Sequence, residues 1–132
     1  MLPRLAAIQF ERFMSTGKTS PALCGCEDRA GRYVGEYVVK LRAAVGVPGL
    51  LIELVSARLA RHFGIASPDP ALVTIEEALA DLVATSQPAK AALIRGSAGL
   101  NFGTKVITGG AIWPTEKSIP EAMWQAAVDF LA

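Results

Sequence analysis

The stretch GRYVGEYVVKL, residues 31–41, is the strongest strand signal in the chain and carries one lysine. Its valines and tyrosines favour an extended strand, and two glycines punctuate the run. Lys40 lies between Val39 and Leu41, so we expect its side chain to be held close to the interior. Any fold of this chain must therefore place the Lys40 ammonium at the end of a strand rich in valine and tyrosine.

The next element predicted is an amphipathic helix over residues 50–63, after a short Gly- and Pro-containing turn. One side carries an apolar stripe at helical spacing, formed by Ile52, Val55, Leu59 and Phe63. The other side carries the carboxylate of Glu53 with small residues, Ser56, Ala57 and Ala60. Small residues allow another element to come close, so we expect Glu53 to face a sheet.

Lys40 and Glu53 together suggest a functional pair. A strand lysine followed thirteen positions later by a helix glutamate is the arrangement by which a kinase small lobe holds the lysine that touches nucleotide phosphates. We therefore predict that Lys40 and Glu53 bind nucleotide. Two plainer interpretations remain open: a strand-end lysine whose ammonium reaches water, and a glutamate paired within its own helix.

The remaining pattern predicts short strands and helices around these two elements. Strands are expected over residues 5–13, 22–26, 71–75 and around 101–107, and helices over 76–86, 87–95 and 120–132. The predicted fold class is α+β and kinase N-lobe-like. It is an antiparallel sheet of about four to five strands with one long packed helix and two further helices. The whole chain, residues 1–132, is expected to form a single domain.

Composition narrows the classes of partner. The net charge is +1, from 13 basic and 12 acidic residues, which gives no electrostatic footprint for nucleic acid. No apolar run approaches the roughly 20 residues that cross a bilayer, so we expect no membrane partner and a cytoplasmic location. The two cysteines, Cys24 and Cys26, are too few for a disulfide framework. Together with the one distant histidine they also do not complete a four-ligand metal site. Both cysteines are therefore expected to pack inside the protein. No metal site is predicted.

The segment STGKTS, residues 15–20, resembles part of a phosphate-binding loop. The Walker pattern needs a glycine where this chain has Arg12, and it needs a helix where a strand is predicted, so that interpretation is disfavoured. Two alternatives stay open. The segment is either a solvated hairpin loop or a turn whose backbone and hydroxyl groups approach phosphates. In the second case the cofactor-binding residues are Ser15, Thr16, Gly17, Thr19 and Ser20.

Three runs in this order resemble the N-terminal half of HipA-like kinases, bacterial Ser/Thr kinase-like proteins related to toxin components of toxin–antitoxin systems. The runs are SPALCGCEDRAGRYVGEYVVKL, GLLIELVSARLARHFGIASPDPALV and LIRGSAGLNFGTKVITG. The most specific parts are YVVKL, the IELVSARLARHFG helix followed by Pro68, and SAGLNFG. The resemblance covers most of the chain.

The resemblance implies an ATP-directed small lobe, in which Lys40 contacts the phosphates, Glu53 orients Lys40 and residues 15–20 lie near the phosphates. The catalytic aspartate and the metal-binding residues of such kinases have no counterpart among these residues, so Mg would be held from outside this chain. Phosphoryl transfer depends on those groups, and the chain is expected to be incomplete for it alone.

The partners implied are a nucleotide, a missing kinase lobe or other protein, and a second copy of the chain. The alternative function is a stand-alone lobe that binds or regulates a protein without catalysis. Trp113, Trp124 and Phe130 are candidates for its docking patch.

Overall fold

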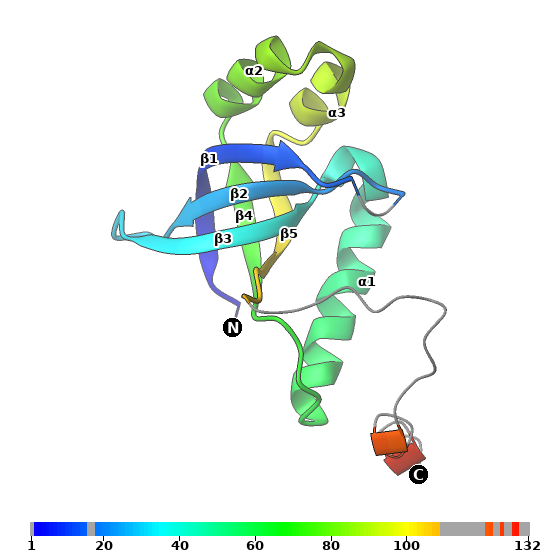
Figure 1. Cartoon of the computed structure of the whole chain (residues 1–132). Helices are drawn as coiled ribbons and strands as arrows, with labels where there is room; N and C mark the ends of the chain where they lie inside the picture. The colour runs from blue at the N-terminus through cyan, green and yellow to red at the C-terminus, as the bar shows by residue number, and fades with distance from the viewer. Residues whose placement is uncertain (1, 16–17, 109–120, 123–124, 126–127, 130–132) are drawn as a thin grey trace.

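The computed structural model describes residues 2–15, 18–108, 121–122, 125 and 128–129. The strands are β1 (Arg4–Phe13), β2 (Ala22–Glu27), β3 (Tyr33–Lys40), β4 (Pro70–Ile75) and β5 (Gly99–Lys105). The helices are α1 (Arg42–His62), α2 (Glu77–Ser86), the 3-10 turn η1 (Pro88–Lys90) and α3 (Ala91–Gly96). Most of the helix predicted over residues 120–132 lies outside the described residues. Figure 1 shows α2 and α3 together at one end of the strands, whereas α1 extends beyond the other end.

The five strands form a closed barrel in the order β1-β2-β3-β5-β4. The barrel is mixed, because β1 pairs with β4 in parallel while the other neighbours are antiparallel. The predicted antiparallel, kinase N-lobe-like sheet is therefore wrong, although the chain is α+β. The reason lies in β1, whose pairing with β2 shifts register between Ala7 and Gln9 and again between Phe10 and Arg12. Such irregularities bend a strand, so the start of β1 can pair with β4 while the rest follows β2.

The core fills the barrel and the space under α2 and α3. Cys24, Val39, Val73 and Phe102 are among the most buried side chains of the strands. Ala80, Val83, Ala84 and Ile94 bury the inner faces of α2 and α3. Both cysteines are free and buried, as expected from the sequence.

Helix α1 begins at Arg42, earlier than predicted, and is kinked. Gly46 interrupts it with φ 70 and ψ 169, a conformation that glycine adopts readily. Pro48 then lies in the first turn of the second part, where its missing N–H costs no helical hydrogen bond. This second part corresponds to the helix predicted over residues 50–63.

The predicted packing of α1 is also corrected, because none of its residues is buried. Ile52, Val55 and Leu59 of the expected apolar stripe are 67%, 53% and 51% exposed. Contrary to the expectation from the sequence, α1 is long and apolar enough to cross a membrane. Length and composition are the only features that indicate a membrane span, and Glu53 lies near the middle of the helix.

Candidate functional site

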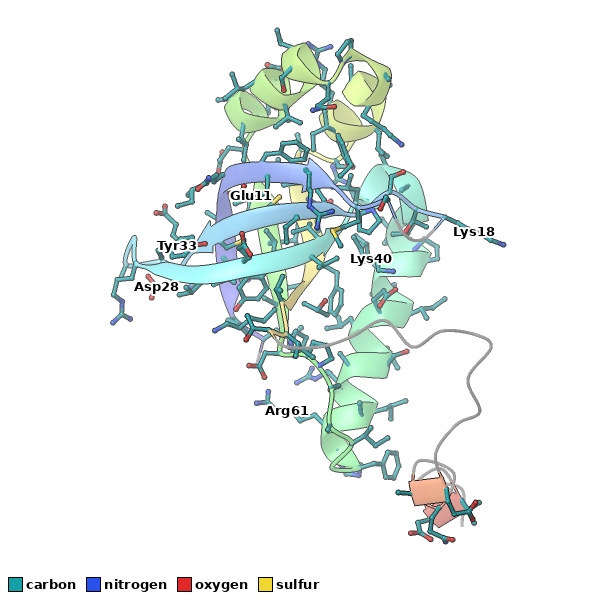
Figure 2. All side chains as sticks on the ribbon, viewed as in Figure 1. Glu11, Lys18, Asp28, Tyr33, Lys40 and Arg61 are labelled. Carbon is teal, nitrogen blue, oxygen red and sulfur yellow. The ribbon has the colours of Figure 1, made fainter. Side chains whose placement is uncertain are left out.

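Lys40 and Glu53 form an ion pair between the end of β3 and the second part of α1. The distance between Lys40 Nζ and Glu53 Oε1 is 3.4 Å. The two side chains are 34% and 38% exposed, so Lys40 is less enclosed than expected from its apolar neighbours. Figure 2 shows Lys40 beside α1. Solvent screens a pair this exposed, and its net contribution to stability is about 0 to 1 kcal/mol.

Helix α1 is held in place by side chains that arrive from β5 and the turn before it. Its N-cap residue, Leu41, offers no side-chain hydrogen bond. The Arg42 N–H donates instead to Asn101 Oδ1 at 2.8 Å, and the Ala43 N–H donates to Ser97 Oγ at 3.1 Å. These two bonds satisfy N–H groups that have no partner within a helix. They anchor the start of the helix that carries Glu53.

Asn101 is nearly fully buried, with 1% exposure, and its amide is completely engaged. Its Nδ2 donates to the carbonyl oxygens of Ser97 and Gly99 at 2.8 and 2.9 Å. The Arg42 guanidinium donates to the carbonyl of Ala98 at 2.6 Å. The segment SAGLNFG thus has a defined structural role, which the sequence interpretation missed. A buried asparagine in an apolar, glycine-rich run was the signal that pointed to it.

The described part of the predicted phosphate-approaching segment, Ser15 and residues 18–20, lies at the same end of the barrel as Lys40. It joins β1 to β2, and Ala22 at the start of β2 is paired with Val39, the neighbour of Lys40. The Met14 N–H donates to the carbonyl of Pro21 at 2.7 Å, which closes the base of the turn. A strand follows the segment, as predicted.

The individual residues of that segment differ in their surroundings. Thr16 and Gly17 lie outside the described residues. Ser15 is exposed and Thr19 is half-buried. Ser20 has a positive φ of 44 and its hydroxyl accepts a hydrogen bond from Lys90 Nζ at 2.7 Å.

Lys90 is a cation that sequence reasoning missed. It lies on η1, 70 positions from Ser20, and its ammonium is 5.8 Å from the centroid of the Phe13 ring. A contact of this kind with an aromatic face stabilises a partly desolvated ammonium. No local sequence signal marks this contact, because only the fold brings η1 to the β1–β2 turn. The helical segment between β4 and β5, which consists of α2, η1 and α3, is thus linked by the Lys90 ammonium to the segment predicted to approach phosphates.

The described residues contain no group of three or more His, Cys, Asp or Glu that could hold a metal ion. The described side chains at this site offer the ammonium groups of Lys40 and Lys90 and the hydroxyl groups of Ser15, Thr19 and Ser20. Trp113, Trp124 and Phe130, proposed from the sequence as a docking patch, lie outside the described residues.

Comparison with known proteins gives one match. A family model described as HipA-like kinase matches residues 7–126, which is most of the chain. The matched range includes β3 with Lys40, the helix with Glu53 and the segment with Ser97 and Asn101. Neither a curated protein nor a solved structure matches the chain.

Proposed function

Because the chain belongs to the HipA-like kinase family, we propose that it is the ATP-directed small lobe of such a kinase. In this proposal the Lys40 ammonium contacts the nucleotide phosphates, and Glu53 orients it. The observation that carries the proposal is the 3.4 Å pair of Lys40 and Glu53, which joins a strand to a helix. Kinases use a lysine–glutamate ion pair of this kind, between a strand and a helix, to position nucleotide.

The exposure of the pair fits this role better than a purely structural one. Lys40 is 34% exposed, so its ammonium remains accessible to a ligand. An ammonium has three donors, and a single contact with Glu53 leaves others for phosphate oxygens. An exposed pair of this kind contributes little to stability, so a structural role offers only a weak reason for it.

The turn between β1 and β2 supplies the second part of the proposed site. Ser15, Thr16, Gly17, Thr19 and Ser20 would approach the phosphates with hydroxyl and backbone N–H groups. The Lys90 ammonium, bound to Ser20 Oγ, adds a positive charge beside the same turn. In this proposal the Lys40 ammonium, the Lys90 ammonium and the turn bind the phosphates together.

The proposed site binds nucleotide but does not complete phosphoryl transfer. Transfer needs metal-held charge neutralisation and a residue that positions the nucleophile. We assign Mg²⁺ binding and that residue to a part of the kinase outside residues 1–132, which we take as one N-terminal domain. We also propose that this chain, like the HipA-like kinases it resembles, is related to toxin components of toxin–antitoxin systems.

Calorimetric titration of the chain with ATP and Mg²⁺ tests the proposal, with Lys40→Met as the diagnostic variant. A charge-assisted hydrogen bond contributes about 1.5 to 3 kcal/mol, so Lys40→Met should weaken ATP binding by at least about tenfold. Glu53→Ala should weaken it less, because Glu53 acts through Lys40.

Lys105→Met is the matched control, since it removes an exposed lysine from β5. It should leave ATP affinity unchanged. Thermal unfolding of all variants should be nearly the same, because the Lys40–Glu53 pair is solvent-screened. Equal ATP affinity in the Lys40→Met and wild-type chains, or no saturable binding at millimolar ATP, would contradict the proposal.

A second candidate function is a protein-binding or regulatory module without catalysis. The exposure of Ile52, Val55 and Leu59 on α1 favours it, because soluble monomers seldom leave such a row in water. The two candidates use different sides of α1, since Glu53 faces β3 and these apolar residues face away from the barrel. They are therefore compatible with each other.

A further inference from the structure

Ser20 has the one strained backbone among the non-glycine residues that the structure describes. Its φ is 44, in the left-handed region that residues other than glycine seldom adopt. Pro21 follows it, and a proline restricts the residue before it to extended conformations. A residue in such a conformation persists only where its surroundings hold it there, and residues of this kind cluster at active sites and ligand sites.

Lys90 is the side chain that holds Ser20. Its ammonium donates to Ser20 Oγ at 2.7 Å, in a partly buried position and across a sequence separation of 70 residues. The same ammonium lies 5.8 Å from the centroid of the Phe13 ring, at the end of β1. The base of the turn is also closed by the backbone, because the Met14 N–H donates to the carbonyl of Pro21 at 2.7 Å. A lysine from η1 and a backbone hydrogen bond thus fix this base together.

The charge of the Lys90 ammonium is not balanced by a carboxylate. None of the ion pairs between residues that the structure describes includes Lys90. Removing an ammonium from water without a counter-ion costs free energy. One of its three donors is used by Ser20 Oγ, so two remain for an anion. A phosphate group would supply both the acceptors and the missing negative charge.

The hydroxyl of Ser20 is prepared as a donor by the same contact. Its oxygen accepts a proton from the Lys90 ammonium, so its own proton is left for another acceptor. Hydrogen bonds in a chain polarise one another, which makes this O–H a stronger donor than that of a free serine. The Lys90 N–H groups and the Ser20 O–H are therefore neighbouring donors for one anion.

We propose that Lys90 is a positioning residue for Ser20, which it holds in the strained conformation so that the Ser20 hydroxyl donates to the phosphates of bound nucleotide. This role rests on the nucleotide-binding function proposed above. It makes the helical segment between β4 and β5 part of the nucleotide site, since η1 sets where the ammonium lies. Ser20 then contributes to phosphate binding only while Lys90 holds it, whereas two independent contacts would have additive effects.

A double-mutant cycle of Ser20→Ala and Lys90→Met, with ATP affinity measured by calorimetry in the presence of Mg²⁺, tests this dependence. In the wild-type background Ser20→Ala should weaken ATP binding at least about threefold and Lys90→Met at least about tenfold. In the Lys90→Met background Ser20→Ala should weaken it less than about twofold. Urea denaturation gives the same cycle for stability. A merely structural bond would couple the two residues in the free energy of unfolding and not in ATP affinity.

Arg95→Met is the matched control for Lys90→Met. It removes a cation from the same helical segment, and Arg95 is paired with Asp81 at 3.0 Å, so ATP affinity should stay at the wild-type value. Two results would overturn the role of Lys90 and leave the nucleotide-binding function standing. One is a Ser20→Ala effect of equal size in both backgrounds, and the other is Lys40-dependent ATP binding that Ser20→Ala does not weaken. A wild-type chain that binds no ATP would overturn both the role and the function.

Discussion

Asn101 Oδ1 accepts the backbone N–H of Arg42 at 2.8 Å, across a sequence separation of 59 residues. The bond fixes the start of α1 against β5, next to the strand that ends at Lys40. Because Glu53 lies three turns further along the same helix, the position of its carboxylate depends on where the helix starts. A buried amide far from the ion pair therefore helps to set the geometry of the pair.

Asn101→Ala should lower the free energy of unfolding by about 2 to 4 kcal/mol. The change leaves the Arg42 N–H and two buried carbonyl groups without their partner and creates a small cavity. If the bond also positions Glu53, the variant should bind ATP more weakly than wild type at a temperature where both are folded. Urea denaturation measures the first effect and calorimetric titration the second.

Thr85→Ala is a suitable control for this prediction. Thr85 is exposed and its hydroxyl donates one hydrogen bond to the carbonyl of Asp81 within α2. Its loss should change the free energy of unfolding by less than about 0.5 kcal/mol. If Asn101→Ala were as stable as Thr85→Ala, Asn101 would not be the anchor of α1.

The sequence predicted the elements well but not how the barrel closes. The pattern of β-branched and aromatic residues gives strand positions, because side-chain alternation is local. The parallel pairing of β1 with β4, for example Leu5 with Val73, is not local and depends on the bend in β1. Nothing in a run such as LAAIQFERF shows where its register with β2 shifts.

The candidate site, like the fold, was predictable only where the signal lies within one segment of the sequence. Lys40 and Glu53 were found because each lies between apolar neighbours in the sequence, and the structure places them 3.4 Å apart. The contact between Lys90 and Ser20 joins two segments with no shared pattern, so only tertiary structure reveals it. The exposure of the stripe containing Val55 was also hidden, because an apolar stripe looks the same whether its partner is the chain's own core or another molecule.

Lys90→Met should loosen the turn between β1 and β2. The variant loses the 2.7 Å hydrogen bond from its ammonium to Ser20 Oγ, a partly buried and charge-assisted contact. Lys18 is exposed in this turn, so trypsin should cleave after it at least about fivefold faster than in wild type, because local opening becomes easier. Mass spectrometry of the early fragments measures this rate.

Arg95→Met provides the comparison for Lys90→Met. Arg95 lies on α3, in the same helical segment between β4 and β5 as Lys90. It forms an exposed ion pair with Asp81 at 3.0 Å. Its loss removes a cation without touching the turn, so cleavage after Lys18 should keep the wild-type rate. An equal rate in the Lys90→Met chain would show that the bond to Ser20 does not restrain the turn.

The two buried thiols should make the protein sensitive to alkali. Burial raises the pKa of Cys24 from 9.0 to about 12 and the pKa of Cys26 to about 11. Both cysteine side chains therefore stay protonated, as neutral thiols, in the folded state. The stability that this provides is fully present below pH 9 and is lost as the pH rises toward 11 to 12, because the unfolded chain releases both protons first. Between pH 8 and pH 10 the loss should be about 2 to 3 kcal/mol.

Urea denaturation at pH 8 and pH 10 measures this loss, and the double variant Cys24→Ala, Cys26→Ala separates the thiols from other groups. The variant lacks both buried thiols, so it should lose clearly less stability over this range. At pH 8 a thiol reagent should leave native wild type unmodified and label two cysteines after unfolding, since thiolates are the reactive form. If wild type and the variant lost equal stability between pH 8 and pH 10, the barrel interior would not be holding these thiols protonated.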